Sequence, residues 1–116
     1  MVEKIVGNHI IVDVVNCNPD KLNDEEFIRE TLLDAAIKGG AGILGIQSYK
    51  FEPQGVTAVV MLSESHENFH SWPELGSFSM DCYTCGDHVN TKLIVDTVVE
   101  AMDGDVKNYT ILKRGF

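Results

Sequence analysis

The sequence predicts an α+β fold: a two-layer sandwich in which an antiparallel sheet carries two helices on one face. Three observations support this prediction. The segments follow the order β-α-β-β-β-α-β, short turns join neighbouring strand segments as in hairpins, and both helical segments have one apolar face. The 116 residues fit one compact domain, in which we find no internal repeat and no linker.

The first part of the chain predicts a strand, a turn and a helix. Residues 9–15 are rich in β-branched side chains, which suit a pleated sheet, and residues 16–20 have turn composition. Asn23 is the expected helix N-cap, with Glu26 as its reciprocal partner, and the Gly39-Gly40 pair is the expected helix end. Residues at helical spacing form the expected core face: Phe27, Ile28, Leu32, Ala35 and Ala36.

Two strands follow this helix, at residues 43–51 and 57–63. Between them, residues 52–55 contain a proline and a glycine, as a tight reversal of the chain requires. Residues 64–76 hold two histidines, a tryptophan, a proline and several polar groups, and we expect them to be irregular.

The last part of the chain predicts a strand, a helix and a final strand. Apolar and polar residues alternate over residues 78–83, as in a half-buried strand. Asn90 is the expected cap of the second helix and Gly104 its expected end, with a last strand at residues 106–112. The apolar face of the second helix consists of Leu93, Ile94, Val98 and Met102.

Composition excludes several classes of function. The net charge of -9 argues against binding to nucleic acid or to an anionic membrane, since both require clustered basic residues. No apolar run reaches the length of a membrane span, and the N-terminus does not resemble a signal peptide, so we expect a cytoplasmic protein with free thiols at its three cysteines. A domain this small leaves apolar surface uncovered, which is compatible with a dimer.

Reactive side chains are densest at residues 63–74 and 82–86, where several interpretations compete. A zinc site could use His66, His70, Cys82 and Cys85. The two cysteines, however, are three apart at the end of an expected strand, so they should point to opposite faces, and we expect no metal site here.

Two further interpretations have weaker support. A redox C-x-x-C motif normally opens a helix, whereas here the expected helix begins several residues after Cys85. A hydrolase using Ser63 or Ser65 with His70 as base lacks a nucleophile elbow around either serine.

A fourth interpretation is self-processing, in which a serine hydroxyl attacks the carbonyl group of the residue before it. This chemistry needs a strained turn and a nearby base. The Glu64-Ser65 bond stands at a strand end, and His70 is a candidate base, since imidazole groups in general can exchange protons near neutral pH. Residue spacing alone does not select among these four interpretations.

The selection comes from a family resemblance. The runs 63–66, 70–74 and 83–86 (SESH, HSWPE and YTCG) closely resemble the prokaryotic S-adenosylmethionine decarboxylases, which are pyruvoyl-dependent decarboxylases made as proenzymes. Shorter runs at 7–9, 50–51 and 53–56 also look like that family. The likeness extends over almost the whole chain, in the same order.

The resemblance implies self-cleavage between Glu64 and Ser65. Residues 1–64 would become the β chain and residues 65–116 the α chain, with Ser65 converted into a covalent pyruvoyl cofactor. In the family, that group forms a Schiff base with the substrate amine and accepts electrons during decarboxylation. The product of S-adenosylmethionine decarboxylation is the aminopropyl donor of spermidine and polyamine biosynthesis.

The resemblance also implies roles for individual residues. His70 matches the processing base, Cys85 the proton donor in turnover, and Thr57 a position where the family usually has a serine that assists processing. Phe51 matches an aromatic residue that stacks on adenine, and Glu74 an acid that binds the ribose hydroxyls. Family members are homodimers with sites at or near the subunit interface.

Departures from the family pattern leave the substrate open. The family often has an apolar-Thr-apolar triplet between the two histidines, where this chain has Glu67-Asn68-Phe69, and Gly-Arg-His near the start is here Gly7-Asn8-His9. Relatives with the same machinery decarboxylate arginine or ornithine. The alternatives are therefore an arginine or ornithine decarboxylase, or an uncleaved, non-catalytic regulatory partner.

Overall fold

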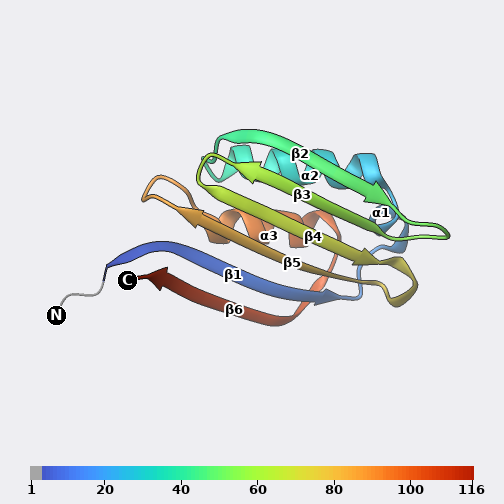
Figure 1. The fold of residues 1–116 in the computed structure, drawn as a ribbon. Helices are drawn as coiled ribbons and strands as arrows, with labels where there is room; N and C mark the ends of the chain where they lie inside the picture. Colours follow the sequence, from blue (N-terminus) through green and yellow to red (C-terminus); the bar gives the residue numbers. More distant parts are fainter. Residues whose placement is uncertain (1–3) are drawn as a thin grey trace.

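A computed structural model describes residues 4–116; the first three residues of the expected β chain lie outside the described part. The described residues form a six-stranded antiparallel sheet in the order β2-β3-β4-β5-β1-β6, with the helices on one side (Figure 1). This confirms the predicted α+β sandwich. The elements are β1 (Ile5–Val15), α1 (Pro19–Leu22), α2 (Glu25–Lys38), β2 (Ile43–Lys50), β3 (Val56–Leu62), β4 (Ser65–Trp72), the 3-10 helix η1 (Pro73–Leu75), β5 (Ser77–Cys85), α3 (Thr91–Ala101) and β6 (Asp105–Gly115).

The expectation that residues 64–76 are irregular is wrong. Most of this segment is β4, a central strand that pairs with β3 on one side and β5 on the other. Its side chains do alternate, but two of the three that face the helices are polar, since Glu67 and Ser71 are buried with Phe69 between them. Polar residues at inward positions hide the period-2 pattern from the sequence.

The helix starts also differ in part from expectation. The N-cap of α2 is Asp24, whose side chain accepts a hydrogen bond from the backbone N–H of Phe27, and Asn23 instead accepts one from Gly55 N–H. The expected turn at residues 16–20 contains Asn18, which caps the short helix α1. The expected Asn90 cap of α3 is confirmed, because its side chain accepts from Leu93 N–H.

The core lies between one face of the sheet and the helices α2 and α3. Phe69 and Phe78 stack at its centre with ring centroids 4.8 Å apart. Burying apolar side chains of this size is the main stabilising contribution to a small domain. None of the helices in residues 4–116 is long and apolar enough to cross a membrane.

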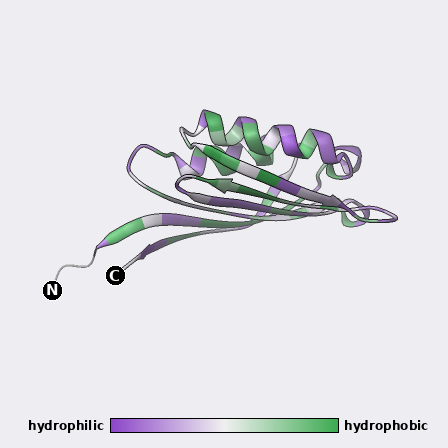
Figure 2. Ribbon diagram, turned by 45° about the horizontal axis from the view of Figure 1, so that its top comes forward, coloured by the Kyte–Doolittle hydropathy of each residue, from purple (hydrophilic) through white to green (hydrophobic). Residues whose placement is uncertain are grey.

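The opposite side of the sheet, called the open face here, has no element over it in the described chain (Figures 1 and 2). Alternation along the strands directs a mixture of polar and apolar side chains to this face. The exposed apolar members are Ile11, Tyr49, Val59, Met61, Trp72 and Leu112.

Candidate active site

The peptide bond between Glu64 and Ser65 lies in the tight turn that joins β3 to β4. Leu62 and Ser65 are paired across this turn, which leaves only Ser63 and Glu64 between them. Ser65 has a φ of 141°, which is rare for any residue other than glycine. The carbonyl oxygen of Glu64 accepts a hydrogen bond from the backbone N–H of Cys85 at 3.0 Å, which polarises this carbonyl group.

The side chain of Glu64 is held by three donors. One carboxylate oxygen accepts from Gly42 N–H at 3.0 Å and from the Ser63 hydroxyl at 2.9 Å, and the other lies 2.8 Å from His88 Nε2. These hydrogen bonds, with that of His88 the largest contribution, lower the pKa of Glu64 to about 2. Glu64 is therefore a fixed carboxylate at neutral pH.

Cys85 ends β5 beside this turn. Ser65 pairs with Thr84 on the neighbouring strand, so Cys85 is one position beyond the residue opposite Ser65. Its thiol is free and half-buried. Glu64, Ser65 and Cys85 thus lie together, and we call them the Ser65 group.

Thr57 and His70 are cross-strand partners on the open face. The hydroxyl of Thr57 lies 3.1 Å from His70 Nδ1, and the imidazole is exposed. His70 is five positions from Ser65 along an extended strand, which separates their Cα atoms by about 16 Å. Within one chain, His70 does not reach Ser65.

Phe51 and Glu74 are at the same end of the sheet as His70. Phe51 follows β2, is 46% exposed and has its ring centroid 4.8 Å from that of Tyr49. Glu74 is exposed in η1, directly after β4. We call Phe51, Thr57, His70 and Glu74 the His70 group; this group and the Ser65 group occupy opposite ends of the central strands.

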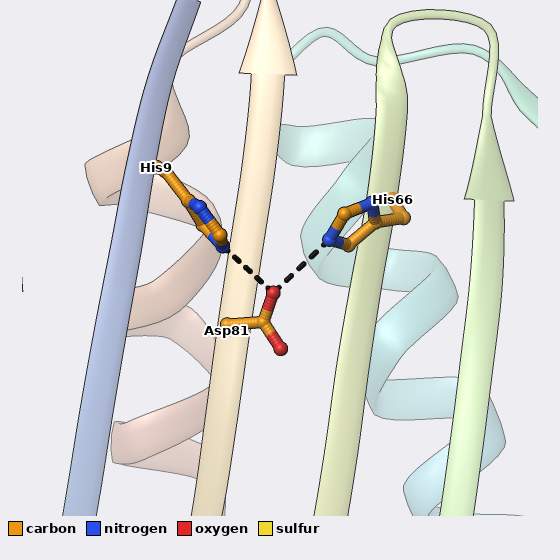
Figure 3. Close-up of side chains that lie close together, drawn as sticks. All are labelled: His9, His66 and Asp81. Carbon is orange, nitrogen blue, oxygen red and sulfur yellow. Dashed lines mark hydrogen bonds and ion pairs between the residues drawn. The ribbon is translucent and has the colours of Figure 1, made fainter. Parts of the chain in front are cut away.

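The structure adds a cluster that the sequence analysis did not predict. His9 on β1 and His66 on β4 both direct Nε2 to the same oxygen of Asp81 on β5, at 2.8 and 3.0 Å (Figure 3). Although partial burial acts to raise the pKa of Asp81, hydrogen bonds from His9, His66 and Asn68 hold it below its ordinary value. His9 and Asp81 are 72 positions apart, and only the strand register brings them together.

Two histidines and an aspartate are also a common donor set for transition metals. Here the guanidinium of Arg114 donates to His9 Nδ1 at 3.0 Å, so the ring proton of a neutral His9 is on Nε2, the atom that faces Asp81. A metal ligand would need a free electron pair at that atom. The geometry is therefore that of a hydrogen-bonded His-Asp-His network.

The competing interpretations from the sequence fit this geometry poorly. Cys82 is fully buried among core residues, where burial raises the pKa of its thiol, whereas Cys85 alternates to the open face. The zinc donors His66, His70, Cys82 and Cys85 therefore do not converge, and the two thiols do not face each other. The separation of Ser65 from His70 also argues against a serine hydrolase pair within one chain.

Known proteins resemble this chain over nearly its full length. The family model for S-adenosylmethionine decarboxylase matches residues 8–115. An S-adenosylmethionine decarboxylase proenzyme of Anoxybacillus flavithermus is 46% identical over 95% of this chain and 88% of its own length, and a second such proenzyme, of Halalkalibacterium halodurans, is 41% identical over 95% and 87%. The crystal structure of the adenosylmethionine decarboxylase from Aquifex aeolicus superimposes with a TM-score of 0.91 at 32% identity, covering 97% of this chain and 93% of that one. The chain belongs to the S-adenosylmethionine decarboxylase family.

Proposed function

We propose that this chain cleaves itself between Glu64 and Ser65 and that the resulting pyruvoyl enzyme decarboxylates S-adenosylmethionine. One observation carries the cleavage proposal: the Glu64-Ser65 bond lies in a tight turn, with Ser65 at positive φ and the Glu64 carbonyl oxygen bound to an N–H group. The relatives named as proenzymes support it.

The first step converts the peptide bond into an ester. The hydroxyl oxygen of Ser65 attacks the carbonyl carbon of Glu64, the C–N bond breaks, and the nitrogen of Ser65 becomes a free amine. Negative charge develops on the Glu64 oxygen during the attack. The Cys85 N–H, already 3.0 Å from that oxygen, is placed to stabilise the charge.

The second step eliminates the ester. A base removes the α-proton of Ser65, the main-chain carboxylate of Glu64 leaves as the new C-terminus of the first fragment, and residue 65 becomes dehydroalanine. Addition of water with loss of ammonia gives a pyruvoyl group at the N-terminus of the α chain, residues 65–116, and leaves residues 1–64 as the β chain. We assign His70 as the base, with Thr57 orienting its ring through the hydrogen bond to Nδ1.

Because His70 and Ser65 are about 16 Å apart in one chain, we infer that a second copy completes the site. The open face carries exposed apolar side chains from five strands, as an interface between subunits requires. Two copies related by a two-fold axis, with their open faces together and their strands reversed, would bring the His70 group of one over the Ser65 group of the other. The dimer would contain two equivalent shared sites.

The residues present fit a pyruvoyl enzyme. When formed, the group supplies an electron sink for the loss of carbon dioxide. The half-buried thiol of Cys85 is beside residue 65 and can return a proton to the substrate carbon. Phe51 offers an exposed ring for adenine and Glu74 a carboxylate for ribose hydroxyls. The net charge of -9 favours a cationic sulfonium substrate, and we place the reaction in the cytoplasm.

Intact mass under denaturing conditions tests the cleavage. The wild-type chain should give two fragments that break at Glu64/Ser65, with the second lighter by one ammonia than a fragment that begins with serine. Ser65→Ala should give one full-length chain without activity. Turnover by that variant would contradict the pyruvoyl mechanism, and carbon dioxide release from S-adenosylmethionine, arginine and ornithine would identify the substrate.

A further inference from the structure

We propose that the side chain of Glu64 is a positioning residue for self-cleavage: together with His66, it holds Ser65 in a strained backbone conformation. This inference rests on the proposed cleavage at Glu64/Ser65 and assigns a role to the two residues that flank Ser65.

The Glu64 carboxylate links the turn to two other segments. Gly42 N–H is in the connection that precedes β2, and His88 is in the loop between β5 and α3. The third donor, the Ser63 hydroxyl, belongs to the turn itself. Hydrogen bonds to a carboxylate are shorter and stronger than those between neutral groups. The residue before the cleaved bond is therefore fixed by its side chain as well as by its carbonyl group.

The residue after Ser65 is fixed in a similar way. His66 Nε2 lies 3.0 Å from Asp81 on the neighbouring strand, and Asp81 is itself held by His9 (Figure 3). Ser65 is thus between two neighbours whose side chains are both tied to other elements of the sheet or its loops.

This arrangement explains how Ser65 keeps a φ of 141°. A non-glycine residue adopts such a conformation only when the surrounding structure enforces it. Relaxation of the backbone at Ser65 would require Glu64 or His66 to give up its contacts. The contacts therefore keep the bond strained and its carbonyl group against the Cys85 N–H, and the attack on that carbonyl starts from a fixed geometry.

The strain can be measured without any cleavage. In the two uncleavable variants Ser65→Gly and Ser65→Ala, the glycine variant should melt higher by roughly 4 °C, because glycine adopts positive φ without a steric cost. When Glu64→Ala is added to both, residue 65 can relax, and the difference should shrink to about 1 °C or less. We call the hold of Glu64 and His66 on residue 65 the clamp. An unchanged difference in melting temperature would overturn the clamp, whether or not the wild-type chain cleaves itself.

The rate of cleavage gives the second test. Glu64→Ala should slow the appearance of the two fragments by about tenfold or more, since each tenfold loss corresponds to about 1.4 kcal/mol, the size of one or two lost hydrogen bonds. Glu64→Gln should lose less, because its amide oxygen can still accept from Gly42 and Ser63. Glu100→Ala removes an exposed acid at the far end of α3 and should cleave at the wild-type rate.

The two proposals fail in different ways. An uncut wild-type chain contradicts self-cleavage, while the melting comparison still decides the clamp. A wild-type chain that cuts, with Glu64→Ala cutting equally fast, contradicts the clamp and leaves the proposed function in place.

Discussion

Glu67 is the most unusual side chain in the core. It is fully buried on the helix-facing side of β4, and neither carboxyl oxygen has a hydrogen-bond partner among the described residues. Burial raises its pKa to about 8. The side chain is therefore neutral at neutral pH, at a position two residues after Ser65.

Glu67 should make the free energy of unfolding depend on pH. The unfolded chain loses this proton near the ordinary glutamate pKa of 4.5, whereas the folded chain keeps it up to about pH 8. Unfolding is therefore increasingly favoured as pH rises from about 4.5 to about 8, and the loss levels off above that. In the uncut Ser65→Ala background, Glu67→Leu should increase stability by roughly 2–4 kcal/mol at pH 8 and by much less at pH 5.

Urea unfolding at pH 5, 6, 7 and 8 measures this difference. At each pH, subtracting the free energy of unfolding of the parent variant cancels the contributions of other groups that titrate in the same range. If the stability gain from Glu67→Leu is the same at pH 5 and pH 8, the carboxyl group does not titrate as described.

Single residues also show how far the sequence predicted the site. The SESH run and Cys85 led to the Ser65 group, and the structure places those residues together. The His9-Asp81-His66 network was missed, because its members come from three strands and meet only through the sheet register. The roles of the His70 group remain predictions.

At the scale of elements, most of the fold followed from periodicity and caps. The two long helices and five of the six strands in residues 4–116 were predicted near their observed places. β4 was missed because its inward-facing side chains include Glu67 and Ser71. A buried polar residue is compatible with a strand only when the fold supplies a hydrogen-bond partner or tolerates the free-energy cost of burying an unpaired polar group. Neither condition can be read from the local sequence.

Ser71 has such partners, and we expect it to stabilise the junction of β4 with β3 and α1. Its hydroxyl donates to the carbonyl oxygen of Leu22 at 2.7 Å and accepts from Val56 N–H at 3.0 Å, and so connects β4 with α1 and β3. Ser71→Ala leaves both buried groups unpaired and should destabilise the fold by roughly 1–3 kcal/mol.

Urea unfolding in the Ser65→Ala background tests this role. Ser77→Ala is the matched control, because among residues 4–116 that half-buried hydroxyl binds only the carbonyl oxygen of Leu75, and its loss should cost about 0.5 kcal/mol or less. Equal losses for the two variants would show that the Ser71 hydrogen bonds do not stabilise the junction.

At the scale of the whole molecule, the two groups of site residues lie at opposite ends of the central strands. Shared sites in a dimer predict complementation between two inactive variants. His70→Ala alone should stay uncut. Co-expressed with Ser65→Ala, the His70→Ala chain should be cut, because in the mixed dimer its Ser65 faces the intact His70 of the other chain.

Intact mass identifies which chain is cut, since the two variants differ in mass. The control partner is the double variant Ser65→Ala, His70→Ala. It lacks the imidazole of residue 70 and should leave the His70→Ala chain uncut. Absence of cutting with the single-variant partner, in a sample shown to contain mixed dimers, would mean that His70 does not act across the interface.

The strand order has a consequence for the molecule after cleavage. The proposed cut falls between β3 and β4, yet β1, which would belong to the first fragment, lies between β5 and β6 of the second. The two fragments would be interleaved, and separating them would break three ladders of hydrogen bonds: β3–β4, β1–β5 and β1–β6. After heat unfolding, each cleaved wild-type protomer would have to reassemble from two separate chains, whereas each uncut Ser65→Ala protomer refolds from one. Recovery after heating should depend more strongly on protein concentration for the cleaved protein than for Ser65→Ala, whose protomers need a second chain only to form the proposed dimer, and the processed molecule should persist mainly because it opens slowly.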